Sequence, residues 1–233
     1  MERESIEYDV VVVGGGPSGL ASACKLKQLN PELSVCLLEK GSEIGSHIIS
    51  GAVFEPQTLF DLFPEEAKNC PTLKTSVVKD DLYWLTSSNK SIKVPSWLMP
   101  KSLHNKGNYI ISLGELCQWI AERAMDLGVD IFPGFPAQQY LSDTNGRVIG
   151  IATGDMGIDK DGNQKGTYTP GMDILAKQTI FAEGARGHLG KKLIKEFGLD
   201  EGKTPQHFAI GFKEIWEVNN DKHSPGNVLH TMG

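Results

Sequence analysis

The sequence predicts an α/β fold that begins with a parallel sheet. Residues 8–13 are a β-branched apolar run that stops at three glycines, the pattern of a buried parallel strand. Residues 19–29 carry apolar side chains at helical spacing, and Asn30-Pro31 ends this helix. Residues 34–38 have a second buried-strand pattern. Strand, glycine turn, helix and strand form a βαβ unit, which is right-handed in nearly all known cases.

The rest of the chain is predicted to be mixed. Residues 41–108 are irregular, with glycine, proline and serine between short apolar pieces; a loop-rich insertion of this length is usually functional. The later elements are a helix over 113–127 closed by Gly128, a strand over 129–132, a hairpin of 137–141 and 147–153, and a strand over 172–182.

Composition restricts the class of protein. The 233 residues allow one large domain or about one and a half ordinary ones, with an adequate core. A net charge of -6 predicts no nucleic-acid partner. Four widely spaced cysteines, Cys24, Cys36, Cys70 and Cys117, contain no CxxC pair, so we predict reduced structural thiols and no metal site in this chain.

The glycines after the first strand predict a dinucleotide site. Gly14, Gly16 and Gly19 form G-x-G-x-x-G between a buried strand and a helix, and Glu39 follows 20 residues after Gly19, at the end of the next strand. The helix N-terminus offers unpaired N–H groups and a positive dipole end to a diphosphate. The predicted binding residues here are Gly14, Gly15, Gly16, Pro17, Ser18, Gly19, Glu39 and Lys40.

Glu39 favours FAD or NAD over NADP, because its carboxylate accepts hydrogen bonds from ribose hydroxyls and repels a 2′-phosphate. Residues 179–187 resemble the second fingerprint of glutathione-reductase-like and hydroxylase-like FAD proteins, which favours FAD. Taken alone, this segment also fits an ordinary strand-to-helix turn. Further candidate FAD-binding residues are Ala137, Ala182, Glu183 and Gly184.

Several segments resemble the electron-transfer flavoprotein:ubiquinone oxidoreductase family in order along nearly the whole chain. They are Glu39-Lys40-Gly41, residues 44–52 with the pattern HxxSGA, residues 106–109, Phe181-Ala182-Glu183-Gly184, residues 211–217 (GFKEIWE) and residues 230–233 (HTMG). Some of these are not general FAD signatures. The resemblance implies electron transfer from reduced electron-transfer flavoprotein to ubiquinone, with FAD and one [4Fe-4S] cluster whose ligands are not in this chain.

The resemblance also implies an arrangement of domains. A glutathione-reductase-like FAD-binding Rossmann domain, residues 1–90 and 109–200, is interleaved with a mixed α+β quinone-binding and membrane-contact region, residues 91–108 and 201–233. The C-terminal iron–sulfur part is absent. Ser50, Gly51 and Ala52 are placed near the isoalloxazine ring, although a buried turn is the alternative. His47 is a weak candidate proton donor, and a packed or solvated loop histidine is its alternative.

Residues 94–101 predict contact with a membrane. Pro95, Trp97, Leu98 and Met99 form an apolar piece followed by Lys101, the composition of a shallow interface anchor or a quinone entrance. The alternative is a loop packed on its own domain. No signal peptide or spanning segment is expected, so contact comes from one side. We expect a peripheral protein on the inner, cytoplasmic membrane of a bacterium, or on the matrix side of the mitochondrial inner membrane.

Two other readings stay open from the sequence. An FAD-dependent hydroxylase or prenyl-reductase-like flavoprotein would share the glycine loop, Glu39 and the Ala182-Glu183-Gly184 turn, without an iron–sulfur cluster. The chain is also compatible with a non-catalytic FAD-binding fragment that another chain completes.

Overall fold

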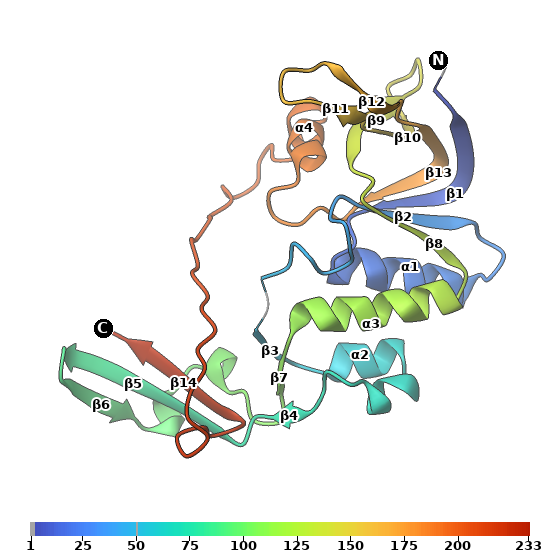
Figure 1. Ribbon diagram of the computed structural model, residues 1–233. Coiled ribbons are helices and arrows are strands. Elements are labelled where there is room, and N and C mark those ends of the chain that lie inside the picture. Colours follow the sequence, from blue (N-terminus) through green and yellow to red (C-terminus); the bar gives the residue numbers. More distant parts are fainter. Residues whose placement is uncertain (1–2, 50) are drawn as a thin grey trace. The chain divides into compact units, whose positions relative to one another are not determined.

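The computed structural model describes residues 3–49 and 51–233, which form two compact units (Figure 1). The first unit contains Met1–Ile48 and Cys117–Ala209, and the second contains Ile49–Leu116 and Ile210–Gly233. The helices are α1 (Pro17–Leu29), α2 (Gln57–Leu62), α3 (Leu113–Asp126) and α4 (His188–Glu196), with 3-10 turns at Glu66–Asn69, Ser96–Leu98 and Lys101–Leu103.

A six-stranded sheet in the order β8-β2-β1-β13-β10-β9 forms the first unit. The neighbours β8, β2, β1 and β13 are parallel, and β10 and β9 continue the sheet antiparallel. The strands are β1 (Ser5–Val13), β2 (Val35–Glu39), β8 (Val129–Pro133), β9 (Ala137–Ser142), β10 (Val148–Thr153) and β13 (Asp173–Phe181), and a separate hairpin pairs β11 (Met156–Ile158) with β12 (Gln164–Thr169).

The order of the strands creates a switch point beside β1. The chain passes from β1 through α1 to β2 on one side, and β13 later pairs with β1 on the other side. In open α/β sheets, ligands bind outside the carboxyl ends of the strands at such a point. The loops after Val13 and Phe181 meet there, since these two residues are register partners. The predicted α/β fold and its N-terminal βαβ unit are confirmed.

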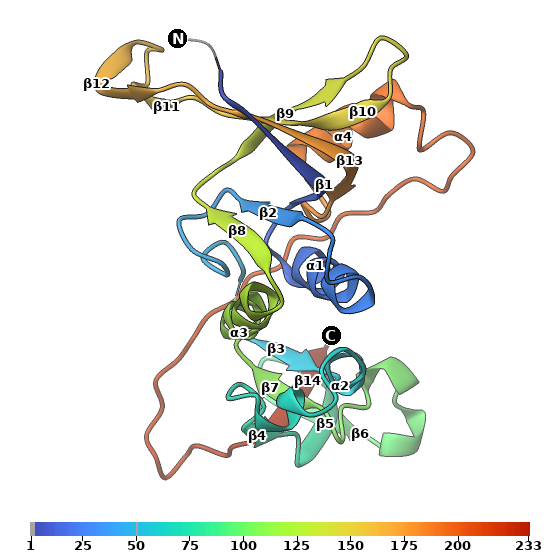
Figure 2. The ribbon, with the colours of Figure 1, turned by 90° about the vertical axis from the view of Figure 1, so that its right-hand side faces the viewer.

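The core explains why these residues form a parallel sheet. Residues 10–13 and 35–38 are buried on both faces, so their apolar runs do not alternate with polar residues. Helices α1 and α3 lie on one face of the parallel strands (Figure 1, Figure 2). In α1 the side chain of Leu20 is completely buried, which stabilises the fold by about 1.5–3 kcal/mol.

The second unit contains two small sheets. One has the order β3-β7-β4 and the other the order β14-β5-β6, in which β14 is parallel and β6 antiparallel to β5. These strands are β3 (Ala52–Phe54), β4 (Thr75–Ser76), β5 (Lys79–Ser87), β6 (Lys90–Val94), β7 (Tyr109–Ile111) and β14 (Asn227–Met232).

The division of the chain differs from the predicted boundaries, which gave residues 1–90 and 109–200 to the nucleotide-binding domain. Residues 49–90 belong to the second unit because β3 and β4 pair with β7, and β5 pairs with β14 and β6. Residues 201–209 belong to the first unit instead. Both units are discontinuous in sequence, and the assignment of one part to flavin and the other to quinone stays a prediction.

The four cysteines are free and buried. Burial raises the pKa of the Cys24 and Cys36 thiols to about 12 and that of Cys117 to about 11. Such thiols stay protonated near neutral pH and are poor nucleophiles. Across the described residues, no helix combines the length and apolar character required to span a bilayer.

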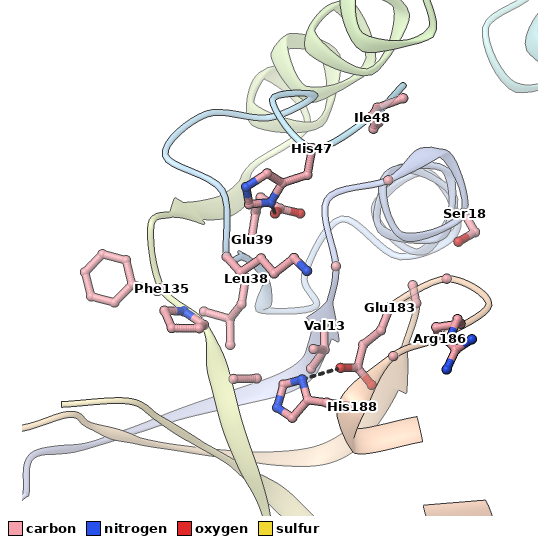
Figure 3. Close-up of a pocket in the computed structure, with 18 of the residues that line it drawn as sticks. Val13, Ser18, Leu38, Glu39, His47, Ile48, Phe135, Glu183, Arg186 and His188 are labelled. Atoms are coloured by element: carbon pink, nitrogen blue, oxygen red, sulfur yellow. Dashed lines mark ion pairs between the residues drawn. The ribbon is translucent and has the colours of Figure 1, made fainter. Parts of the chain in front are cut away.

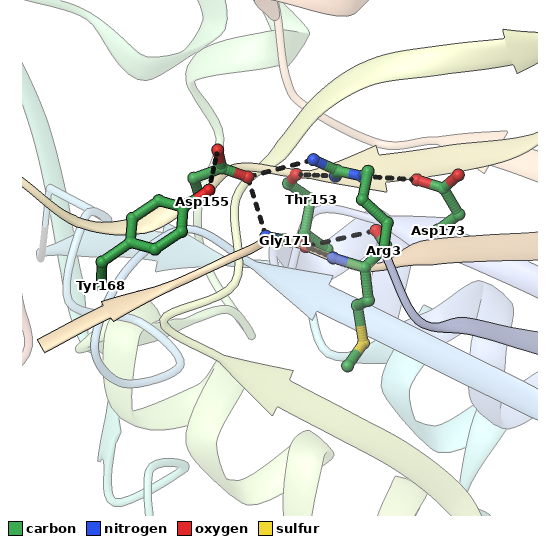
Figure 4. Close-up of polar contacts among 7 residues, drawn as sticks. Arg3, Thr153, Asp155, Tyr168, Gly171 and Asp173 are labelled. Carbon is green, nitrogen blue, oxygen red and sulfur yellow. Dashed lines mark hydrogen bonds and ion pairs between the residues drawn. The ribbon is translucent and has the colours of Figure 1, made fainter. Parts of the chain in front are cut away.

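The side chain of Arg3, near the N-terminus, forms hydrogen bonds to segments of the first unit that are distant in sequence (Figure 4). Arg3 donates from Nη1 to Asp155 Oδ1 at 3.0 Å, from Nε to Asp173 Oδ1 at 3.0 Å, and from Nη2 to the Thr153 carbonyl at 2.7 Å. The Gly171 N–H also donates to Asp155, and chiefly for this reason the pKa of that carboxyl lies below its usual range. The guanidinium therefore joins the ends of β10 and β13 to the chain that leads into β1.

We expect Arg3→Ala to lower the melting temperature by a few degrees, because three donated hydrogen bonds are lost at once. The side chain of Arg3 is 34% exposed, so each ion pair contributes modestly. Thermal melting followed by circular dichroism measures the change, with Lys165→Ala on the exposed β12 strand as the control. Equal melting temperatures for the two variants would contradict a stabilising role of Arg3.

Candidate functional site

A cavity of about 450 Å³ lies where β1 and β13 end in the first unit (Figure 3). Loops that follow three parallel strands, β1, β2 and β13, contribute to its wall, together with the start of β9 and the start of α4. The lining residues are Val13, Gly14, Gly16, Pro17, Ser18, Leu38, Glu39, Lys40, His47, Ile48, Phe135, Pro136, Ala137, Ala182, Glu183, Gly184, Arg186, Gly187 and His188. This is the sheet edge at which the switch point predicts a ligand.

Three glycines shape the loop between β1 and α1, each for a different reason. Gly14 has a φ of 110°, and a Cβ there would lie 2.5 Å from the Ala182 carbonyl oxygen. A Cβ on Gly19 would overlap the Gly14 carbonyl oxygen. A Cβ on Gly16 would have no atom within 4 Å, and Gly16 lines the cavity. Gly14 and Gly19 thus allow the chain to pack, whereas Gly16 keeps space open at the cavity wall.

The N-terminus of α1 faces the cavity without a cap. Gly16 is the N-cap residue, Pro17 follows at the first helical position, and no side chain caps the helix. The first turn also has no acidic residue. N–H groups at the start of a helix have no partner within it, and they carry the positive end of its dipole. Gly16, Pro17 and Ser18 line the cavity, so this end of α1 suits an anion such as a diphosphate.

Glu39 lies at the end of β2 with its side chain only 13% exposed. Its Oε2 accepts a hydrogen bond from the Gly15 N–H at 2.9 Å, and its Oε1 accepts one from the Gly41 N–H at 2.7 Å. These bonds fix the carboxylate against the glycine loop. A carboxylate has about four acceptor positions, so two backbone donors leave capacity for the hydroxyls of a ribose. The geometry fits the predicted role of Glu39, which stays a prediction.

Glu183 stabilises the local backbone at the opposite wall of the cavity. Its carboxylate accepts hydrogen bonds from the Leu189 N–H at 3.3 Å and the Gly190 N–H at 2.8 Å, at the start of α4. His188 Nδ1 lies 3.2 Å from the same carboxylate (Figure 3). Glu183 therefore caps α4 and holds the loop of residues 184–187 in place at the cavity.

The predicted site residues fall into three groups. The first group lines the cavity and consists of Gly14, Gly16, Pro17, Ser18, Glu39, Lys40, His47, Ala137, Ala182, Glu183 and Gly184. Gly15 and Gly19 shape the loop without lining the cavity. Gly51 and Ala52 belong to the second unit, and Ser50 lies outside the described residues. Their predicted position near a flavin ring stays a prediction.

The membrane candidates lie in the second unit. Trp97 and Leu98 are exposed, at 79% and 56%, whereas Met99 is buried at 7%. The candidates therefore differ in exposure, and their role in contact with a membrane or a quinone stays a prediction. Two 3-10 turns flank Met99, and His104 Nε2 lies 3.3 Å from its carbonyl oxygen. Pro95 and Met99 line a separate hollow of about 410 Å³.

The cavity also contains residues that the sequence did not single out. Arg186 belongs to residues 179–187, which resemble a second FAD fingerprint, and His188 follows this segment directly, so their position in the sequence was the available signal. No signal in the sequence indicated Phe135, because its position at the cavity depends on long-range hydrogen bonds. Its N–H donates to the Glu39 carbonyl, and the neighbouring Gly134 N–H donates to the Gly41 carbonyl. These bonds bring the loop after β8 beside the loop after β2.

Fold and site together define a dinucleotide-binding domain of the type found in FAD-dependent oxidoreductases. Residues 12–65 match the family described as an NAD(P)-binding Rossmann-like domain. A geranylgeranyl bacteriochlorophyll reductase-like protein from Thermoplasma acidophilum is similar in structure, with a TM-score of 0.57 and 24% identity, over 80% of this chain and 42% of that one. The p-nitrophenol 4-monooxygenase PnpA from Pseudomonas putida gives a TM-score of 0.52 at 22% identity, over 79% and 42%. These likenesses show the fold alone.

The whole chain is similar in sequence to the N-terminal part of proteins named electron transfer flavoprotein-ubiquinone oxidoreductase. Identity is 56% with the Pseudomonas aeruginosa protein, over 100% of this chain and 43% of the relative. It is 43% with the mitochondrial protein of Homo sapiens, over 100% and 38%. The resemblance predicted from the sequence is confirmed, and the chain spans about two-fifths of the length of these relatives.

Proposed function

We propose that this chain is the FAD-binding part of an oxidoreductase that takes electrons from reduced electron-transfer flavoprotein and passes them to ubiquinone in a respiratory chain. The observation that carries the proposal is 56% identity, along the entire chain, with a relative of that name. The fold supports the same class, since it is the fold of FAD-dependent oxidoreductases.

The cavity supports FAD as the cofactor. The uncapped start of α1 offers N–H groups to the diphosphate, and Gly16 leaves the space that close approach requires. Glu39 would hold the adenosine ribose, and its charge disfavours a 2′-phosphate. Bound FAD would supply the redox chemistry of the reaction. The residues of this chain would bind and orient it and would exclude water from the cavity wall formed by Val13, Leu38 and Phe135.

The [4Fe-4S] cluster of the full-length protein belongs to the proposal as well. Within residues 3–49 and 51–233, no group of three or more His, Cys, Asp or Glu side chains is placed to hold a metal ion. We propose that its ligands are supplied by the part of the relatives' length that this chain does not span.

A peripheral membrane contact would involve the second unit. Trp97 and Leu98 are exposed, and Lys101 follows them. Tryptophan and lysine beside an apolar side chain suit the interface between lipid headgroups and acyl chains. We propose the inner, cytoplasmic membrane of a bacterium as the location, with the matrix side of the mitochondrial inner membrane as the alternative.

The experiment that tests the function uses the full reading frame that contains this chain. After purification, flavin is measured by absorbance, and the reduced protein is examined by EPR spectroscopy. Bound FAD together with a [4Fe-4S]+ signal is the expected result. Flavin without a cluster signal would reject the proposal and favour a hydroxylase or a prenyl-reductase-like enzyme. Gel filtration of the present chain with FAD would test whether this part retains flavin by itself.

A further inference from the structure

The acidic and basic side chains that line the cavity differ in whether they have hydrogen-bond or ion-pair partners. Both carboxylates, Glu39 and Glu183, accept two backbone N–H groups each. Among the described residues, neither Lys40 nor Arg186 forms an ion pair with an acidic side chain, although both line the cavity. Backbone donors therefore hold both carboxylates in place, and two cations that line the cavity have no acidic partner among the described residues.

Within residues 3–49 and 51–233, Arg186 is held by an aromatic contact that occupies none of its donors. It lies on the loop between β13 and α4, and its guanidinium carbon lies 5.0 Å from the centre of the Phe208 ring. An aromatic ring attracts the face of a guanidinium and uses none of its five N–H groups. The contact restricts the long side chain while its edges stay open to a planar or tetrahedral anion.

The partner suited to this arrangement is a phosphate group. Arg186 and the start of α1, including Ser18, line the same cavity and lie on the same side in Figure 3. Glu39 and Phe135 lie toward the other side of that view. A guanidinium binds phosphate oxygens through two parallel N–H donors, and these charge-assisted bonds are stronger than neutral ones. The end of α1 attracts the same anion with its backbone N–H groups.

We propose that Arg186 is a binding residue for the diphosphate of the dinucleotide, opposite the backbone N–H groups of α1, and that Phe208 preorganises it. The proposal rests on the proposed function, because it requires that the cavity bind FAD. It adds a side chain to a site otherwise built from backbone groups and Glu39. Lys40 is the other cation at the cavity, but no aromatic contact or other partner fixes its side chain among the described residues.

Calorimetric titration with FAD, ADP and adenosine tests the role of Arg186, using the flavin-free protein from the full reading frame that contains this chain. We expect Arg186→Gln to weaken FAD and ADP by at least about tenfold, since a charge-assisted hydrogen bond contributes about 1.5–3 kcal/mol. Adenosine, which has no phosphate, should bind both proteins equally. Arg186→Lys should recover part of the loss because it keeps the charge without the planar fork. Phe208→Leu should cost about two- to fivefold, the range of an exposed cation–π contact.

The control is Lys195→Gln in α4, which removes the same charge from a side chain that does not line the cavity. It should bind FAD like the unmodified chain. Unchanged FAD affinity in Arg186→Gln would overturn the role of Arg186 and leave the proposed function intact. Equal weakening of adenosine would also overturn it, because it would indicate a structural effect. If the flavin-free full-length protein bound neither FAD nor ADP, both proposals would fail.

Discussion

Gly16→Val is expected to leave the fold intact and to remove FAD binding. A Cβ at position 16 has no atom within 4 Å, and its backbone, with φ of -81° and ψ of 179°, is open to any residue. The added side chain would occupy the space in which the diphosphate approaches the N–H groups of α1. Losing one or two charge-assisted hydrogen bonds corresponds to a loss of about a hundredfold in affinity or more.

Two measurements are needed for this variant. Thermal melting should be close to that of the unmodified chain, and titration with FAD should show the loss. Gly166→Val on β12 is the matched control, because a Cβ there also has no atom within 4 Å and the position is exposed outside the cavity. If Gly16→Val bound FAD with undiminished affinity, the diphosphate would not approach the helix at this point.

Gly19→Ala should have the opposite effect and destabilise the fold itself. Alanine normally stabilises a helix relative to glycine by about 1 kcal/mol. Here the added Cβ would overlap the Gly14 carbonyl oxygen and lie 3.3 Å from the Ala182 Cβ. Backbone atoms do not move aside as a flexible side chain does, so we expect a loss of about 1–3 kcal/mol in the free energy of unfolding.

Urea denaturation measures this loss, and a helical glycine elsewhere provides the comparison. A Cβ on Gly190 in α4 would meet only the Glu183 Oε2 atom, at an ordinary distance of 3.6 Å. Gly190→Ala should therefore be neutral, or stabilising by up to about 1 kcal/mol. A Gly19→Ala variant as stable as the unmodified chain would contradict the close approach of α1 to β1.

Local patterns predicted the first unit well. The apolar runs at residues 8–13 and 34–38 form β1 and β2, because strands buried on both faces have a pattern that is visible in the sequence. The hairpin of β9 and β10 and the helix α3 were also predicted, with ends that differ by one or two residues. The glycine spacing identified one wall of the cavity.

Long-range pairing limited the rest of the prediction. Strand β14 pairs with β5, which lies about 150 residues earlier, and no local pattern indicates this partner. The boundary of the second unit depends on that pairing and was therefore misplaced. Phe135 was missed for the same reason. Arg186 lay within a recognised segment, but its significance depends on the position of Phe208.

Residues 208–218 lie outside every helix and strand, and Ile210, Phe212, Ile215 and Trp216 are each at least 76% exposed. Unpaired backbone groups beside large apolar side chains favour association between molecules. We therefore expect the purified chain to associate more as its concentration rises. Repulsion from the net charge of -6 opposes this association, but only weakly in high salt, which screens it. Light scattering at several dilutions, in low salt, should accompany every titration, so that an apparent affinity is not a property of an aggregate.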